Sequence, residues 1–154
     1  MERTDKKLRI CTALLIANIL FIWGNSMLPG ELSGAISQWL RNLLSFLFSG
    51  GGSNSDSGHG LLRKLAHFTE FACLGLLFTW LFGMLRKPFL FALPCGFLAA
   101  CIDETIQRFV PGRGPAFKDV LIDTAGALVG MGILILGYTI RKRQIKRSLE
   151  DNKS

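Results

Sequence analysis

Five carboxylates, one histidine and one glutamine fall in three short motifs with the spacing of a helix face. Members of each motif lie three or four positions apart, on one side of a helix: His67 with Glu70, Asp103 with Gln107, and Asp119 with Asp123, with Glu104 beside Asp103. These seven are the candidate catalytic residues. Carboxylates sharing a partly dry pocket cannot all ionise, so one is expected to keep a proton as a general acid. His67 is the candidate base, with Glu70 orienting its ring.

Three further polar residues are candidates for substrate binding: Asn25, Ser26 and Arg113. Asn25 and Ser26 end the first long apolar stretch of the chain. Arg113 lies in the segment Pro-Gly-Arg-Gly-Pro over 111–115, whose glycines and prolines predict an exposed turn. Its planar guanidinium suits a phosphate or a carboxylate. Taken alone, Arg113 could equally be a headgroup anchor or the partner of Asp119.

The residue types leave the cofactor unknown. One histidine among carboxylates could hold a hard divalent cation, but the sequence has no HExxH motif and no dense histidine set. The cysteines all lie inside apolar stretches without a CxxC pair, at positions 11, 73, 95 and 101. Neither a disulfide framework nor a thiolate zinc site is therefore expected.

Membrane-spanning helices must position these residues. The chain has 154 residues, 49% of them apolar, and its mean hydropathy of +0.36 is above the values usual for soluble domains. A membrane-crossing helix needs about 20 mostly apolar residues. Four stretches qualify, near 8–28, 65–85, 88–109 and 120–140, before a basic tail over 141–154. We expect one all-α integral membrane domain over 1–154 with four transmembrane helices.

The connection between the first two spans has two parts. Residues 32–48 carry apolar side chains at helical spacing and Trp39, which predicts an interfacial or re-entrant helix in the first outer loop. Residues 49–60 are almost wholly Ser, Gly, Asn and Asp, a composition typical of a flexible linker. We expect this segment to be a linker within one domain rather than a domain boundary.

Basic residues indicate the orientation of the spans. Twelve of the 18 lie on the side of the two termini and the 86–87 turn, and six lie on the other side. Because basic residues resist translocation, both termini are expected to be cytoplasmic in a bacterial plasma membrane. The formal net charge of +7 is thus a topology signal, and no basic surface for nucleic acid is expected. The first span could instead be a signal peptide, but its apolar stretch is long for one.

This topology brings the polar motifs to one end of the bundle, at the outer leaflet. The face of Asp103 continues through Ala92, Gly96 and Ala99, and that of Asp123 through a GxxxG formed by Gly126 and Gly130. Small residues let helix backbones approach, so both faces are expected to point into the bundle, away from lipid. The same polar residues could alternatively form a hydrogen-bond network that only stabilises the packing of the helices.

The order of these motifs resembles the VanZ-like family of small bacterial membrane proteins. The matching strings are Asn25-Ser26, the HFxE of 67–70, the DExxQ-FxPGR of 103–113 and the DxxxDxxGA of 119–127. The resemblance implies a multi-pass envelope protein, and the founding member is linked to low-level teicoplanin resistance. Two features depart from the pattern: Phe71 stands where a tyrosine is common, and 114–118 replace a small, Ser-rich stretch.

The leading hypothesis is an outer-leaflet pocket that binds or modifies the headgroup of a lipid or a lipid-linked cell-envelope intermediate. In the alternative, the protein is a non-enzymatic membrane scaffold or adaptor. Transport is a third hypothesis. It is weakened because the polar residues lie at one leaflet only, whereas a transport pathway needs polar sites near the middle of the membrane. The sequence leaves open both whether the protein is an enzyme and its oligomeric state.

Overall fold

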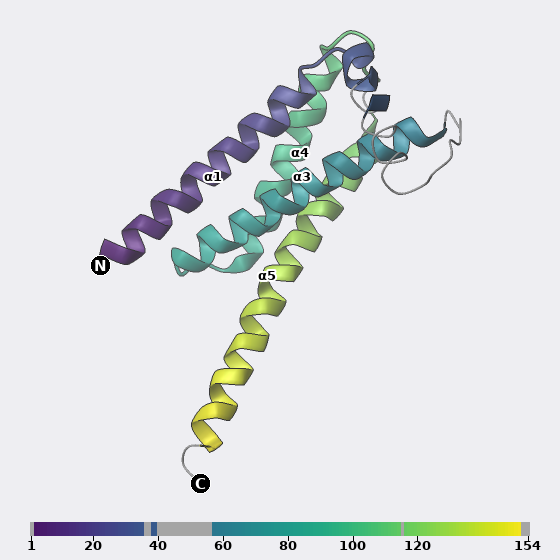
Figure 1. The fold of residues 1–154 in the computed structure, drawn as a ribbon. Helices are drawn as coiled ribbons and strands as arrows, with labels where there is room; N and C mark the ends of the chain where they lie inside the picture. The colour runs from purple at the N-terminus through teal and green to yellow at the C-terminus, as the bar shows by residue number, and fades with distance from the viewer. Residues whose placement is uncertain (1, 36–37, 40–56, 115, 152–154) are drawn as a thin grey trace.

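The computed structural model describes residues 2–35, 38–39, 57–114 and 116–151 (Figure 1). In this part of the chain the long helices are α1 (Glu2–Ser26), α3 (Ser57–Met84), α4 (Ala92–Arg108) and α5 (Phe117–Asp151), and a 3-10 turn η1 (Phe89–Phe91) precedes α4. Each contributes a stretch long and apolar enough to cross a membrane, four in all among the described residues. The expectation of an all-α integral membrane fold with four spans is confirmed.

Several helix boundaries differ from the predicted spans, and α1 already begins at Glu2 instead of near residue 8. α3 begins at Ser57, inside the predicted linker, and α5 continues to Asp151, through most of the predicted tail. Lys, Arg, Gln and Leu are strong helix formers, so the last span can continue as a helix beyond its apolar part. The remainder of the predicted linker, 49–56, lies outside the described residues.

Only part of the predicted interfacial helix over 32–48 is described. Its described residues, 32–35 and 38–39, are helical, and this helical segment begins at Gly30. Trp39 is 65% exposed, as an interfacial side chain would be. Residues 36–37 and 40–48 lie outside the described part of the chain.

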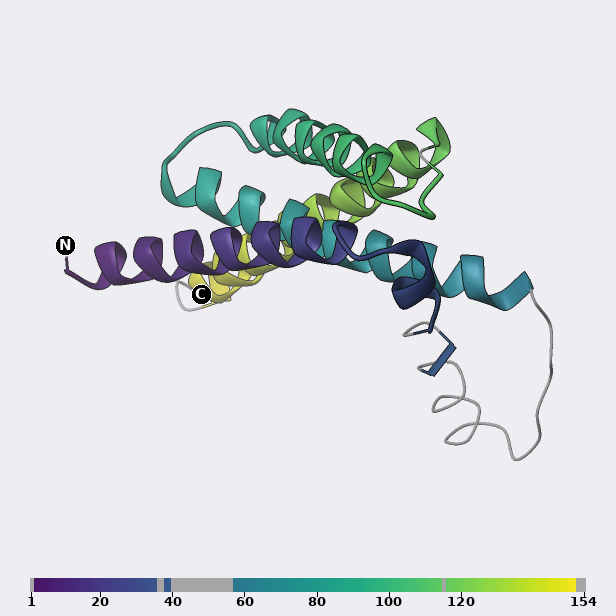
Figure 2. The same ribbon diagram turned by 90° about the horizontal axis from the view of Figure 1, so that it is seen from above.

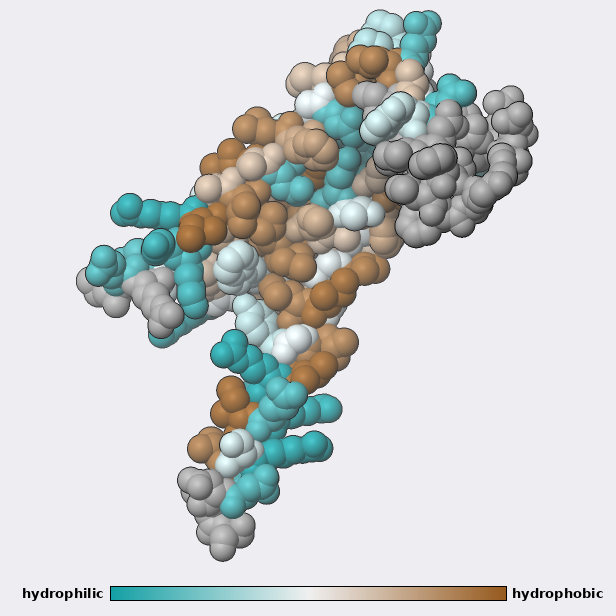
Figure 3. All heavy atoms as spheres, in the orientation of Figure 1, coloured by the Kyte–Doolittle hydropathy of each residue, from teal (hydrophilic) through white to brown (hydrophobic). Residues whose placement is uncertain are grey.

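The helices run alternately up and down, and α3 packs against α1, α4 and α5. Figures 1 and 2 show the first turns of α1 and the last turns of α5 at the end of the bundle opposite the last turn of α4 and the start of α5, with α5 extending beyond the other helices. In Figure 3 hydrophobic side chains cover much of the middle of the visible face, and hydrophilic ones gather at the N-terminal arm and on the lower part of α5. This distribution fits a bundle whose middle lies in hydrocarbon.

The most extensive interface, between α3 and α5, depends on small residues. A Cβ added at Gly126 would meet the backbone carbonyl of Phe68, and one at Gly130 would meet that of Ala72. The GxxxG face of α5 therefore lies against a neighbouring backbone, as predicted. Leu128, on another face of α5, is 43% exposed.

The hydrophobic core lies between this interface and α1 and α4. It contains buried side chains from all four helices: Ile22, Phe71, Leu74, Ala99, Ala100 and Val120. Phe71 is completely buried there, so a phenyl ring without a hydroxyl fills the position at which many relatives were expected to carry tyrosine. Burying a ring without a polar atom requires no hydrogen-bond partner.

Candidate functional site

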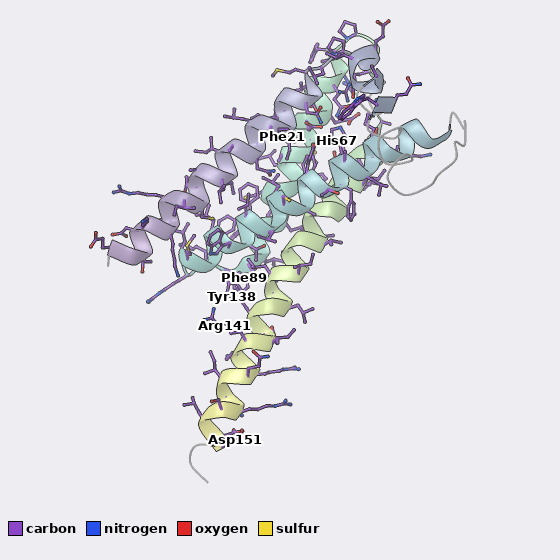
Figure 4. The ribbon with its side chains drawn as sticks, viewed as in Figure 1. Phe21, His67, Phe89, Tyr138, Arg141 and Asp151 are labelled. Atoms are coloured by element: carbon purple, nitrogen blue, oxygen red, sulfur yellow. The ribbon has the colours of Figure 1, made fainter. Side chains whose placement is uncertain are left out.

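Polar side chains from all four helices meet at the end of the bundle opposite the termini. Figure 4 labels His67 on α3 at this end. The buried polar residues here are Ser26, His67, Asp103, Glu104, Gln107, Arg113 and Asp123. The faces of α4 and α5 that carry Asp103 and Asp123 are buried along their small residues, as expected. The packing of these small residues in the middle of the bundle therefore positions Asp103 and Asp123 at its end.

Three of these residues form a compact cluster. His67, Asp103 and Asp123 come from α3, α4 and α5, and each offers one potential ligand atom within 4.8 Å of the others. His67 Nδ1 lies 3.9 Å from Asp103 Oδ2 and 3.7 Å from Glu70 Oε2. These distances place the candidate base beside two carboxylates, including the one expected to orient it.

A hydrogen-bond network connects this cluster to the end of α1. Gln107 Nε2 donates to Asp103 Oδ2 at 2.8 Å and to Ser26 Oγ at 3.3 Å. Asn25 Nδ2 donates to Glu70 Oε1 at 3.1 Å. Asn25 therefore binds Glu70 on α3, and Ser26 is connected through Gln107 to Asp103 on α4. They act on the site residues directly, which is compatible with a positioning role.

Arg113 is turned inward from an exposed turn. Its Nε donates to the carbonyl of Leu28 at 3.2 Å, its Nη2 to that of Asn25 at 3.0 Å, and its Nη1 to Gln107 Oε1 at 3.4 Å. Burial lowers the pKa of Arg113 from its ordinary value, and the nearby positive charge of Arg63 lowers it further. The backbone around it is exposed as predicted, but its side chain is 8% exposed.

The alternative in which Arg113 pairs with Asp119 is wrong. Lys64 Nζ lies 3.8 Å from Asp119 Oδ1, at the edge of the site, where both side chains are partly exposed. Asp119 is thus less buried than Asp123, one turn further along α5. The guanidinium reaches the end of α1 because Gly112, at φ 72°, turns the chain back toward Gly30, whose amide donates to the Pro111 carbonyl at 3.1 Å.

Several buried polar atoms of the site have no hydrogen-bond partner among the described residues. They include His67 Nδ1, Glu70 Oε2, Asp103 Oδ1 and Glu104 Oε2. In the described ranges, neither Glu70 nor Asp103 nor Asp123 forms an ion pair with a lysine or an arginine. Such groups are costly to bury without compensation, so the site has unused capacity to bind a ligand.

Glu104 lies apart from this cluster, although it is next to Asp103 in sequence. Its Oε1 accepts a hydrogen bond from the Ala116 amide, just before α5 begins. Glu104 lines a separate groove of about 280 Å³ between α4 and the start of α5, with Cys101, Thr105, Arg108, Ala116, Phe117 and Val120. The expectation of one shared pocket is therefore only partly met: six of the seven candidate catalytic residues lie around the cluster, and Glu104 faces the groove.

A small cavity of about 10 Å³ opens beside the cluster. It is lined by Arg63, Lys64, His67, Gln107, Asp119, Ile122 and Asp123. This volume holds about one water molecule or one ion. Arg63 and Lys64 are not among the predicted site residues, although their positions four and three residues before His67 place them on its face of α3.

The comparison with known families agrees with the motifs. The profile of the VanZ/LLP1 family matches residues 11–138. The chain belongs to the VanZ/LLP1 family. The matched range includes every residue of the polar cluster, so this cluster lies within the family's own domain rather than in an added segment. No curated protein and no solved structure matches the chain.

Proposed function

We propose that this VanZ/LLP1 protein binds the headgroup of a lipid or a lipid-linked cell-envelope intermediate at the outer surface of the bacterial plasma membrane, and that its acid cluster can act on that headgroup. The observation that carries the proposal is the groove between α4 and α5. Its volume of about 280 Å³ is near the lower end of small-molecule sites, about 300 Å³.

The side chains around the groove match the chemistry of a phosphorylated headgroup. Arg108 is an exposed cation on its lining and can pair with a phosphate. Glu104 also lines the groove, and its carboxylate can accept a hydrogen bond from a hydroxyl or an ammonium group. Phe109 and Phe117 are 81% and 71% exposed, and exposed rings at this position suit the boundary between headgroups and hydrocarbon.

The division between Asp103 and Glu104 suggests separate roles. Glu104 would contact the headgroup, while Asp103, His67 and Asp123 would form the reactive part behind it. In this scheme His67 accepts a proton from an attacking group, and a protonated carboxyl of the cluster donates one to a leaving group. A change to envelope headgroups would also alter what a glycopeptide meets, which would explain a link to teicoplanin resistance.

The proposed orientation follows from charge. Arg9 and Lys7 precede the apolar part of α1, and Arg141 and Lys142 follow that of α5, at the same end of the bundle. Basic residues of this kind favour the cytoplasm, which puts the polar cluster at the outer leaflet.

The scaffold alternative is supported by a different observation. The network from Arg113 through Gln107 to Ser26 joins three segments and needs no ligand to be satisfied. It accounts for Asn25, Ser26, Gln107 and Arg113 as stabilising residues. It leaves the unpartnered oxygen of Glu104 unexplained, because a purely structural acid would be expected to have its oxygens hydrogen-bonded.

Native mass spectrometry of protein released from phosphatidylglycerol nanodiscs tests headgroup binding. Arg108→Gln should lose retained lipid, because the groove loses its cation, whereas Arg143→Gln on the exposed tail of α5 should retain it. Equal loss in both variants would indicate a general charge effect and contradict a defined site. Equal retention in both would remove the groove from the proposal.

A further inference from the structure

We infer that His67, Asp103 and Asp123 form a binding site for one divalent transition-metal cation at the junction of α3, α4 and α5. This site is distinct from the groove of Glu104 and Arg108, and the inference holds whether or not a headgroup binds there. With the cation bound, His67, Asp103 and Asp123 are its ligands and do not carry the proton transfers proposed above. The three residues are far apart in sequence, which explains why no compact metal motif is present.

The donor atoms are nearly close enough to share an ion. One atom from each of the three residues lies within 4.8 Å of the other two. Bonds of about 2.1 Å put opposite ligands about 4.2 Å apart and neighbouring ligands about 3 Å apart. Movement of each donor atom by less than about 2 Å therefore closes the site around a cation.

Unpartnered atoms point to the same ligand. Asp103 is completely buried, and its Oδ1 has no hydrogen-bond partner among the described residues. His67 is 7% exposed, and its Nδ1 also has no hydrogen-bond partner there. Beside them lies the cavity of about 10 Å³, which has room for about one ion or one water. His67, Gln107, Asp119 and Asp123 line it together with Ile122, Arg63 and Lys64, so acids and basic residues both border it. A buried acceptor and a buried imidazole nitrogen without partners, next to a cavity of this size, are the features of a metal site.

Charge balance supports a cation. Glu70, Asp103 and Asp123 are close together, and in the described part of the chain none of them forms an ion pair with lysine or arginine. The buried Arg113 is linked to Asp103 through Gln107 and supplies one positive charge for these three carboxylates. Burying several carboxylates in a low dielectric is unfavourable unless a positive charge or protons compensate them. A divalent cation supplies that charge where the three side chains meet.

Neighbouring residues would hold the ligands in place. Gln107 Nε2 donates to Asp103 Oδ2 at 2.8 Å, which leaves Oδ1 for the cation. Glu70 Oε2 lies 3.7 Å from Nδ1 of His67, the same nitrogen that would bind the cation, so Glu70 is a further carboxylate beside the site and does not orient the ring. Amides that orient metal ligands, as Gln107 orients Asp103, are common around metal sites.

The donor set indicates the class of metal. Two carboxylates favour Mn²⁺ and Mg²⁺, and one imidazole favours Zn²⁺ and other transition metals. Mn²⁺ accepts both kinds of donor, and its unpaired electrons make it a suitable probe. The open positions would be filled by water or by an oxygen of a bound molecule.

The test uses the full chain in detergent with a purification tag free of histidine. After metal removal by a chelator, Mn²⁺ is titrated and free Mn²⁺ is followed by electron paramagnetic resonance. The parent protein should bind one Mn²⁺ per chain, and Asp123→Asn should weaken the affinity by at least about tenfold. Glu31→Gln, which changes an exposed carboxylate at the same end of the bundle, should bind like the parent.

Nitrogen coupling to the bound ion identifies the imidazole. Pulsed resonance should detect one ¹⁴N nucleus in the parent and none in His67→Gln, even where that variant binds more weakly. If Asp123→Asn does not fold, Asp103→Asn and His67→Gln carry the same comparison. Absence of Mn²⁺ binding at millimolar concentration, or equal binding in every variant, would overturn the site in favour of carboxyls that share protons.

Discussion

Gly130→Ala tests whether α3 and α5 meet along their backbones. The added Cβ would contact the carbonyl oxygen of Ala72, and would lie 2.7 Å from its carbonyl carbon and 3.0 Å from the Leu76 amide nitrogen. Because such atoms normally lie about 3.5–4.0 Å apart, the helices must separate by about 1 Å. Backbone atoms cannot rotate away, so we expect the upper end of the overpacking range, about 3 kcal/mol. Alanine returns about 1 kcal/mol through helix propensity, for a net loss of about 2 kcal/mol.

Gly137→Ala on the same helix is the matched control. Nothing lies within 4 Å of a Cβ at that position. This variant should be neutral or up to about 1 kcal/mol more stable, because only helix propensity changes. The free energy of unfolding is measured by SDS titration in mixed micelles, followed by tryptophan fluorescence. Equal stability of the two variants would refute the close contact between α3 and α5, and with it the placement of Asp123 next to His67.

Three further predictions concern the polar end. Arg113→Lys should lose about 2 kcal/mol of stability, because an ammonium cannot make the same set of hydrogen bonds; an unchanged melting temperature would contradict the inward-facing guanidinium. Asp123→Asn in chelator should melt at or above the parent temperature, because it buries one charge fewer, and a large destabilisation would indicate a paired carboxylate. In a cysteine-free background, single cysteines at Lys118 and Lys146 should label from opposite sides of the membrane, the first from outside; labelling from one side would reject the proposed topology.

The fold could be predicted largely from local properties of the sequence. The length of an apolar stretch determines whether a helix can span the bilayer, and the spacing of small residues such as Gly126 and Gly130 determines which face can approach a neighbour. Alternating directions of the spans then bring His67 and Asp103 to the same end. Both properties are read along a single helix, so no knowledge of packing was needed.

The arrangement within the site could not be predicted in the same way. Asp103 and Glu104 are consecutive, and neighbouring positions on a helix point about 100° apart, so they reach different surroundings. Which of them joins His67 depends on how α4 is rotated against α3 and α5. The inward turn of Arg113 likewise depends on contact between the 109–116 turn and the end of α1, which are far apart in the sequence.

Helix ends were the other difference. The sequence gives no sharp boundary at Ser57, because Ser and Gly are common both in linkers and at the start of a helix. The predicted end of the last span near residue 140 is too early for α5, because the apolar residues end there but the helix does not. A helix that leaves the bilayer keeps its backbone hydrogen bonds and can continue in water when its residues are good helix formers.

We propose above that the polar end of the bundle binds a lipid headgroup and does not only stabilise the packing of the helices. Glu104→Gln tests it directly, because glutamine keeps an oxygen to accept the Ala116 amide while removing the acid. We would measure the melting temperature and the retention of phosphatidylglycerol on the same preparation. We expect an unchanged melting temperature and a loss of phosphatidylglycerol retention. A large loss of stability, with lipid retention falling only in proportion to the folded fraction, would contradict it.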